Sequence, residues 1–181
     1  MDQVLNQGGF KLDRALLVDP DFLQPEYPFE WAGMYHLQTG DYEWNFKHSP
    51  VAFLNTALIP IDSEPDDVPE SAVKTADLVF CETEHMVYPG AAFAPGRTLH
   101  RLQMAETESA YSMRIQKTGH YALVSEHHPD EFNAIVYNGI EPVEPLAARE
   151  FKHQHKHDED VTSVGISIPG NLRLGLLEAW L

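Results

Sequence analysis

The feature that most constrains the fold of this chain is an alternation of apolar and polar residues that recurs in its central part. In YEWNF (residues 42–46) three aromatic residues alternate with polar ones, and residues 100–104 and 111–115 repeat the pattern. Successive side chains of a β-strand point to opposite faces of the sheet, so a period of two indicates half-buried strands. Strands at this spacing, joined by short polar turns, predict a small antiparallel β-sandwich-like domain over residues 28–140.

Two segments with glycine indicate how neighbouring strands connect. QTGD (38–41) separates strands predicted at 35–37 and 42–46, and KTGH (117–120) follows the strand predicted at 111–115. We expect each segment to close a β-hairpin, because glycine adopts the backbone conformations of tight turns. Further strands are expected at residues 51–60, 121–127 and 133–137.

One amphipathic helix is predicted within this β-rich region, in residues 63–80. Its apolar stripe consists of Val73, Ala76 and Phe80. Asp66 or Asp67 is expected to cap its N-terminus, since a short acidic side chain accepts a hydrogen bond from the first turn. The predicted fold class is therefore mainly β with α+β elements.

Composition narrows the function classes. The chain has 181 residues and a formal net charge of −16, from 12 basic and 28 acidic residues. Such a surface repels phosphate backbones and anionic lipids, so we expect neither nucleic acid nor a membrane as a partner. The single cysteine, Cys81, excludes a disulfide within the chain and a cysteine-rich zinc site. The first residues lack the pattern of a signal peptide, and the expected location is the cytoplasm.

A histidine-rich segment near the C-terminus is the strongest candidate for a metal site. The predicted ligands are His153, His155, His157, Asp158 and Glu159. In an extended backbone the three imidazoles fall on one side, and imidazole suits zinc, cobalt and nickel. A polar linker offers flexible ligands, which favours weak, exchangeable binding over a structural site. The alternative is a solvated linker with no metal role.

A second, weaker candidate lies in EHHPDEF, where His127, His128, Asp130 and Glu131 are close in sequence. The same residues also predict an ordinary turn around Pro129, and we favour the turn. The remaining histidines of the β-rich region are expected to be surface or packed residues rather than ligands. These are His36, His48, His85, His100 and His120.

The last segment combines a strand predicted at 161–168 with a helix predicted at 172–181. One short strand and one short helix do not bury their own apolar faces. Either this segment begins a domain that is completed elsewhere, or its helix docks on the sandwich. Both alternatives stay open at this point.

Three blocks of the sequence resemble the region that follows the GTPase domain in a subset of CobW-like GTPases, which act as metallochaperones and in cobalamin synthesis. The blocks are LNQGGFKLDRALLVDPDFLQPEYPFEWAGMYHL, YALVSEHHPDEF and HQHKHDEDVTSVGISIPGNL with LEAWL. The resemblance divides the chain into a helical connector from a GTPase domain (1–27), a β-rich insertion (28–140), a His- and acid-rich linker (141–160) and the first strand and helix of the family's C-terminal domain (161–181).

The chain lacks the sequence motifs that carry the catalytic activity of the family. It contains no Gly-Lys pair, so it lacks the P-loop, and its single cysteine excludes the family's Cys-x-Cys-Cys motif. The resemblance therefore implies a non-catalytic accessory region. Such a region would hold zinc or cobalt weakly and contact a CobW-like GTPase domain or a metalloenzyme client.

Two other functions compete with this one. In a pure interaction module, Tyr27, Phe29 and Trp31 would be exposed contact residues, although we favour their closing one end of the sandwich core. A cupin-like metalloenzyme would use the spacing of His153, His155 and Glu159. The chain has Ala147 where that motif has glycine and ends before a second motif, so this function is the less favoured one.

Overall fold

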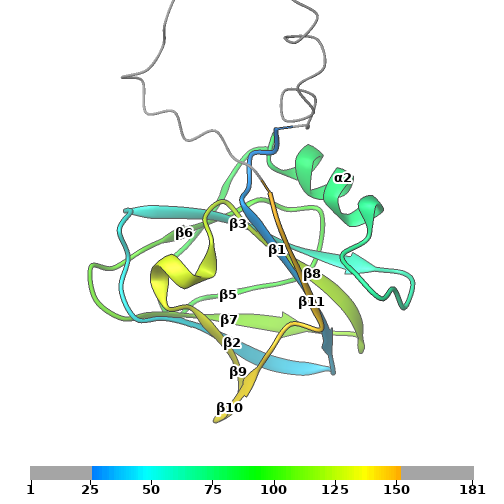
Figure 1. Ribbon diagram of the computed structural model, residues 1–181. Coiled ribbons are helices and arrows are strands. Elements are labelled where there is room, and N and C mark those ends of the chain that lie inside the picture. The colour runs from blue at the N-terminus through cyan, green and yellow to red at the C-terminus, as the bar shows by residue number, and fades with distance from the viewer. Residues whose placement is uncertain (1–25, 152–181) are drawn as a thin grey trace, which may run out of the picture.

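The computed structural model describes residues 26–151, which form a sandwich of two β-sheets with one α-helix (Figure 1). The six-stranded sheet A has the order β11 (Ala147–Glu150), β1 (Trp31–Leu37), β8 (Gly119–Ser125), β3 (Phe53–Ile61), β6 (His100–Gln103) and β4 (His85–Val87). The five-stranded sheet B has the order β10 (Glu141–Val143), β9 (Ile135–Asn138), β2 (Gly40–Phe46), β7 (Ser109–Ile115) and β5 (Ala92–Phe93). The helices are α2 (Glu70–Val79) and the 3-10 helix η2 (Pro129–Phe132).

The predicted fold class, mainly β with α+β elements, is confirmed. The sheets are mixed rather than purely antiparallel, which corrects the prediction. β4 pairs with β6 in parallel at one edge of sheet A, and β5 pairs with β7 in parallel at one edge of sheet B. Both edge strands are only two or three residues long, so they lack the run of alternation that identifies a strand in a sequence.

The two expected hairpins are wrong. β1 and β2 belong to different sheets, and so do β7 and β8, so each glycine-containing segment carries the chain across the sandwich. The two crossings lie side by side, because β1 pairs with β8 and β2 pairs with β7. The backbone N–H of Thr39 in one crossing donates to Oγ1 of Thr118 in the other, at 3.1 Å.

The main core lies between the sheets and is rich in aromatic side chains. The alternation in β2 is confirmed, since Tyr42, Trp44 and Phe46 are all buried on the face toward sheet A. Phe46 makes edge-to-face contacts with Tyr111 and Phe132, at centroid distances of 5.7 and 5.8 Å. Such pairs add to the stabilisation that comes from burying their area.

A second core lies on the outer face of sheet A, under α2. Ala32 and Met34 of β1 are buried there against Val73 and Ala76 of the helix. The central strands of sheet A are thus buried on both faces, which explains why their sequences are nearly continuous apolar runs. The helix begins later than predicted, and no aspartate caps it. Its N-cap residue is Pro69, which has no side chain that could accept a hydrogen bond.

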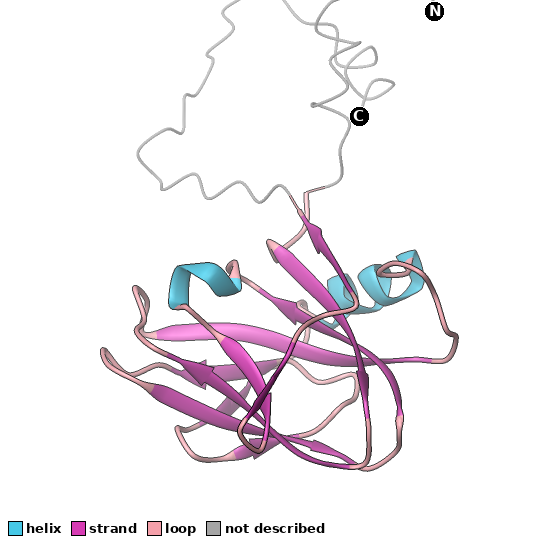
Figure 2. Ribbon diagram, turned by 60° about the horizontal axis from the view of Figure 1, so that its bottom comes forward, coloured by secondary structure: helices cyan, strands magenta, loops and turns pink. Residues whose placement is uncertain are grey.

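The two ends of the described part lie together. β1 and β11 pair antiparallel, and the N–H of Phe151 donates to the carbonyl of Glu30 at 2.7 Å. Phe29 is fully buried and packs edge-to-face against Phe151, with centroids 5.0 Å apart. Strands β10 and β11 occupy residues that were assigned to the linker 141–160. Residues 1–25 and 152–181 lie outside the described part (Figure 2).

Within residues 26–151, the helices are too short to cross a bilayer, which takes about 20 apolar residues.

Candidate functional site

The chain turns sharply after β8, in the segment that carries the weaker predicted metal site. Glu126 fixes the start of this turn, because its N–H donates to the carbonyl of Asn55 at 2.9 Å and its carboxylate accepts from the N–H of Asn55 at 3.0 Å. Pro129 then begins η2, and Asn133 ends the helix in the left-handed region with φ 47°. The turn favoured from the sequence is present, as a single turn of 3-10 helix.

Three potential metal ligands converge where this turn meets the start of β1. One ligand atom each of Glu30, His127 and Glu131 lies within 4.8 Å of the other two. Glu30 Oε2 is 3.8 Å from Nδ1 of His127 and also accepts the backbone N–H of His128 at 3.2 Å. The side chains of His127 and Glu30 are only 16% and 19% exposed, so these two ligands are held in position by their surroundings.

The donor set suits a divalent transition ion. Tetrahedral ligands at ~2.1 Å from zinc stand about 3.4 Å apart, so the pair at 3.8 Å is nearly at that spacing, and atoms up to 4.8 Å apart would close by at most about 1.4 Å. Glu131 is exposed at the surface and has room to make that movement. One imidazole and two carboxylates leave a fourth tetrahedral position for water or for a further ligand.

The other two members of the weaker prediction, His128 and Asp130, make different contacts. His128 Nδ1 accepts the backbone N–H of Asp130 at 3.2 Å. Nε2 lies 3.7 Å from a carboxylate oxygen of Glu150 on β11. His128 therefore caps η2 and approaches β11 instead of joining His127.

The stronger prediction, His153, His155, His157, Asp158 and Glu159, lies outside the described residues. His153 follows Phe151 by two residues in the sequence, and the N–H of Phe151 donates to the backbone carbonyl of Glu30 rather than to its carboxylate. Two residues of extended chain span at most about 7 Å.

The scattered histidines are surface or packed residues, as expected. His36, His48 and His85 are exposed, and the ring of His120 packs at a tilt against that of His36 across β1 and β8, with centroids 4.9 Å apart. His100 is 7% exposed, and burial lowers the pKa of its imidazole.

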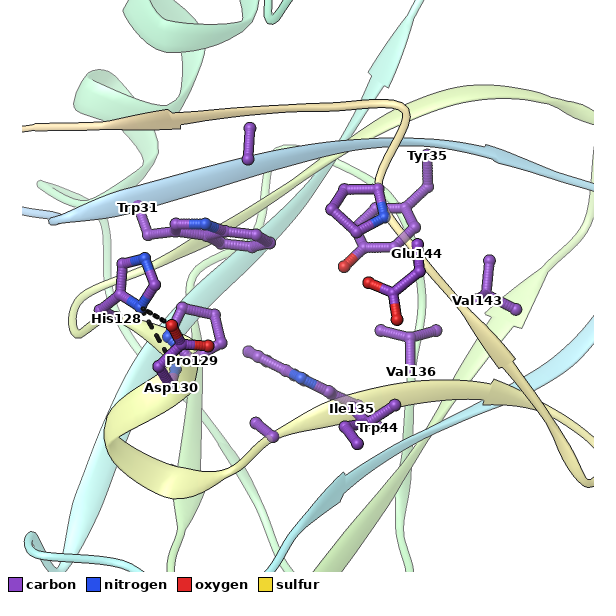
Figure 3. A pocket seen from close by; sticks show the side chains of 13 residues that line it. Trp31, Tyr35, Trp44, His128, Pro129, Asp130, Ile135, Val136, Val143 and Glu144 are labelled. Atoms are coloured by element: carbon purple, nitrogen blue, oxygen red, sulfur yellow. Dashed lines mark hydrogen bonds and ion pairs between the residues drawn. The ribbon is translucent and has the colours of Figure 1, made fainter.

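A separate pocket of about 160 Å³ opens between the two sheets, beside η2 (Figure 3). Aromatic rings from both sheets form its inner walls. Trp31 and Tyr35 come from β1 of sheet A, and Trp44 comes from β2 of sheet B. Exposed carboxylates of Asp130 and Glu144 lie at its rim, and Figure 3 shows Glu144 beside the ring of Tyr35. Burial and the charge of Glu144 raise the pKa of the Tyr35 hydroxyl, so it stays protonated.

A glycine sets the orientation of one wall of this pocket. The indole of Trp31 lies directly over Gly33, where a Cβ atom would come within 2.1 Å of the indole Cη2. Real Cβ atoms do not approach another atom so closely, so only glycine at this position lets the ring lie flat along β1. The pocket could not be predicted from the sequence, because its rings come from β1 and β2, which were expected to pair in one hairpin and instead lie in facing sheets.

Comparisons with protein-family models, with curated proteins and with solved structures found no match to this chain.

Proposed function

We propose that this chain is the accessory region of a CobW-like metallochaperone GTPase, and that it holds a divalent transition ion, zinc or cobalt, in exchangeable form. The observation that carries the proposal is the convergence of Glu30, His127 and Glu131 within 4.8 Å. The resemblance of the three sequence blocks supports the assignment to the CobW-like family. The imidazole and carboxylate ligands of this cluster support a divalent transition ion as the bound metal.

The two groups of proposed ligands differ in how firmly the fold holds them. Glu30 and His127 belong to the folded sandwich and are mostly buried, so they offer ligands of fixed position. The histidine-rich segment starts two residues after Phe151 in the sequence. We propose that an ion passes between the fixed ligands and His153, His155 and His157. A weak site that shares its ion in this way fits delivery better than storage.

The test is isothermal calorimetry of the full chain with Zn²⁺ and with Co²⁺. Glu30→Gln keeps the acceptor for the N–H of His128 while it removes the charge, so it changes the ligand with little effect on the turn. We expect Glu30→Gln and Glu131→Gln each to weaken binding about tenfold, as loss of one ligand charge would. Glu106→Gln, an exposed acid between β6 and β7, is the matched control and should leave binding unchanged.

Alanine at His153, His155 and His157 separates the two ligand groups. If this triple variant also weakens binding, both groups hold the ion, and if it alone abolishes binding, the described cluster has no metal role. Equal binding by Glu30→Gln, Glu131→Gln and Glu106→Gln would refute the proposed cluster. For the partner, we expect the chain to co-purify with a CobW-like GTPase domain, and no complex at micromolar concentration would count against that part of the proposal.

A further inference from the structure

The pocket between the sheets combines aromatic walls with a negative rim. Three of its lining side chains are aromatic, Trp31, Tyr35 and Trp44, and two are carboxylates, Asp130 and Glu144. Of the thirteen residues drawn around it, none is a lysine or an arginine. Its histidine, His128, accepts the backbone N–H of Asp130 at Nδ1, and this nitrogen also lies 3.6 Å from a carboxylate oxygen of Asp130. The charge of the pocket is complementary to a cation.

The placement of the rings defines what kind of cation fits. Trp31 and Trp44 project from opposite sheets and bound the cavity from two sides, with Tyr35 further along β1 (Figure 3). Trp31, Trp44 and Tyr35 are 6%, 1% and 5% exposed, so the core holds the rings in place and only small parts of them border the cavity. Ring faces carry negative potential and attract cations most strongly where water is excluded.

The volume of the cavity limits the size of the ligand. A cavity of about 160 Å³ is close to the ~150 Å³ of an engineered apolar cavity that takes up benzene. A compact group of five or six heavy atoms therefore fits. A primary ammonium would lose hydrogen bonds to water on entering these aromatic walls. A quaternary ammonium has no N–H groups to satisfy and is weakly hydrated, so its transfer costs less.

We propose that this pocket binds a quaternary ammonium group, with the methyl groups against the indoles of Trp31 and Trp44 and the charge offset by Glu144 and Asp130. The proposal is independent of metal binding at Glu30, His127 and Glu131. It assigns the domain a small organic cation as a ligand in addition to a metal ion.

The test uses the full chain and tetramethylammonium chloride as the probe, observed by proton NMR. Methyl protons over ring faces shift upfield, so we expect a saturable upfield shift with a Kd of about 1 mM, which five heavy atoms can supply. tert-Butanol has nearly the same shape without the charge and should bind at least about tenfold more weakly. Equal binding of the two probes, or no saturable shift with tetramethylammonium, would overturn the proposal.

Variants locate the site. Glu144→Gln should weaken binding about threefold, whereas Glu141→Gln, an exposed acid on β10 outside the pocket, should not change it. Trp31→Phe keeps a ring in the core but presents a weaker face, and it should weaken binding about threefold. Because Trp31→Leu risks the fold, Trp31→Phe is the decisive variant of that wall. Unchanged binding in both Glu144→Gln and Trp31→Phe would show that the cation binds elsewhere.

Discussion

Replacing Gly33 by alanine tests how the aromatic wall of the pocket is built. A Cβ at this position would lie 2.1 Å from Cη2 and 2.5 Å from Cζ2 of Trp31. Ordinary carbon contacts lie at about 3.5–4.0 Å, so the indole would have to move by roughly 1.5 Å. Trp31 is 6% exposed and packed into the main core, so the movement has to be shared with its neighbours.

The magnitude follows from two opposing effects. Forcing extra volume into a packed core costs about 1–3 kcal/mol. Alanine instead of glycine within a strand returns about 0.5–1 kcal/mol, because the unfolded chain loses less conformational freedom. We therefore expect Gly33→Ala to lower the free energy of unfolding by about 1–2 kcal/mol.

The assay is urea denaturation followed by circular dichroism, with Gly119→Ala as the matched control. Gly119 is the first residue of β8 in sheet A, and its φ lies outside the left-handed region. An added Cβ there would have no atom within 4 Å. Gly119→Ala should be neutral or slightly stabilising. In a Trp31→Phe background the clash is reduced, so Gly33→Ala should cost less there. If Gly33→Ala is as stable as Gly119→Ala, the indole does not lie over Gly33 as described.

Three further predictions concern single side chains. Phe132→Ala should destabilise the fold by about 3–5 kcal/mol in denaturant titrations because the ring is fully buried, whereas Phe53→Ala, at a residue 39% exposed, should cost clearly less. Burial lowers the pKa of His100 below its usual 6.5, so the unfolded state binds more protons as the pH falls through 6.5, and the free energy of unfolding should decrease there. His100→Gln should reduce this decrease more than His48→Gln, which changes an exposed histidine. Equal pH dependence of the two variants would argue against the shift. The exposed thiol of Cys81 should react fully with a thiol reagent in the native protein, and a protected thiol would contradict its placement.

The sequence predicts which segments are strands better than it predicts how they pair. The alternation in residues 42–46 and 111–115 reports that one face of each strand is buried, and this is correct. The same alternation arises whether the next strand lies in the same sheet or in the facing one. QTGD and KTGH have turn residues in either case, so local chemistry does not separate a hairpin from a crossing.

The candidate metal cluster could likewise be predicted only in part, because one of its ligands comes from a strand that is distant in the sequence. His127 and Glu131 are four residues apart, and their proximity is visible in the sequence. Glu30 joins them because β1 pairs with β8 in a register that sets Trp31 opposite Ser125. That register is a property of the whole sheet, with both faces buried, and no local pattern encodes it.

The pairing of β1 with β11 also determines how the domain responds to a pull. Opposed forces on residues 26 and 151 act at the same end of this antiparallel ladder, where Trp31 faces Glu150. They would load the paired residues one after another toward Met34 and Ala147, as a zipper opens, instead of shearing all bonds at once. β1 keeps its seven-residue pairing with β8 on its other side. A domain held at these two points would release its edge strand at low force while the sandwich behind it stays packed.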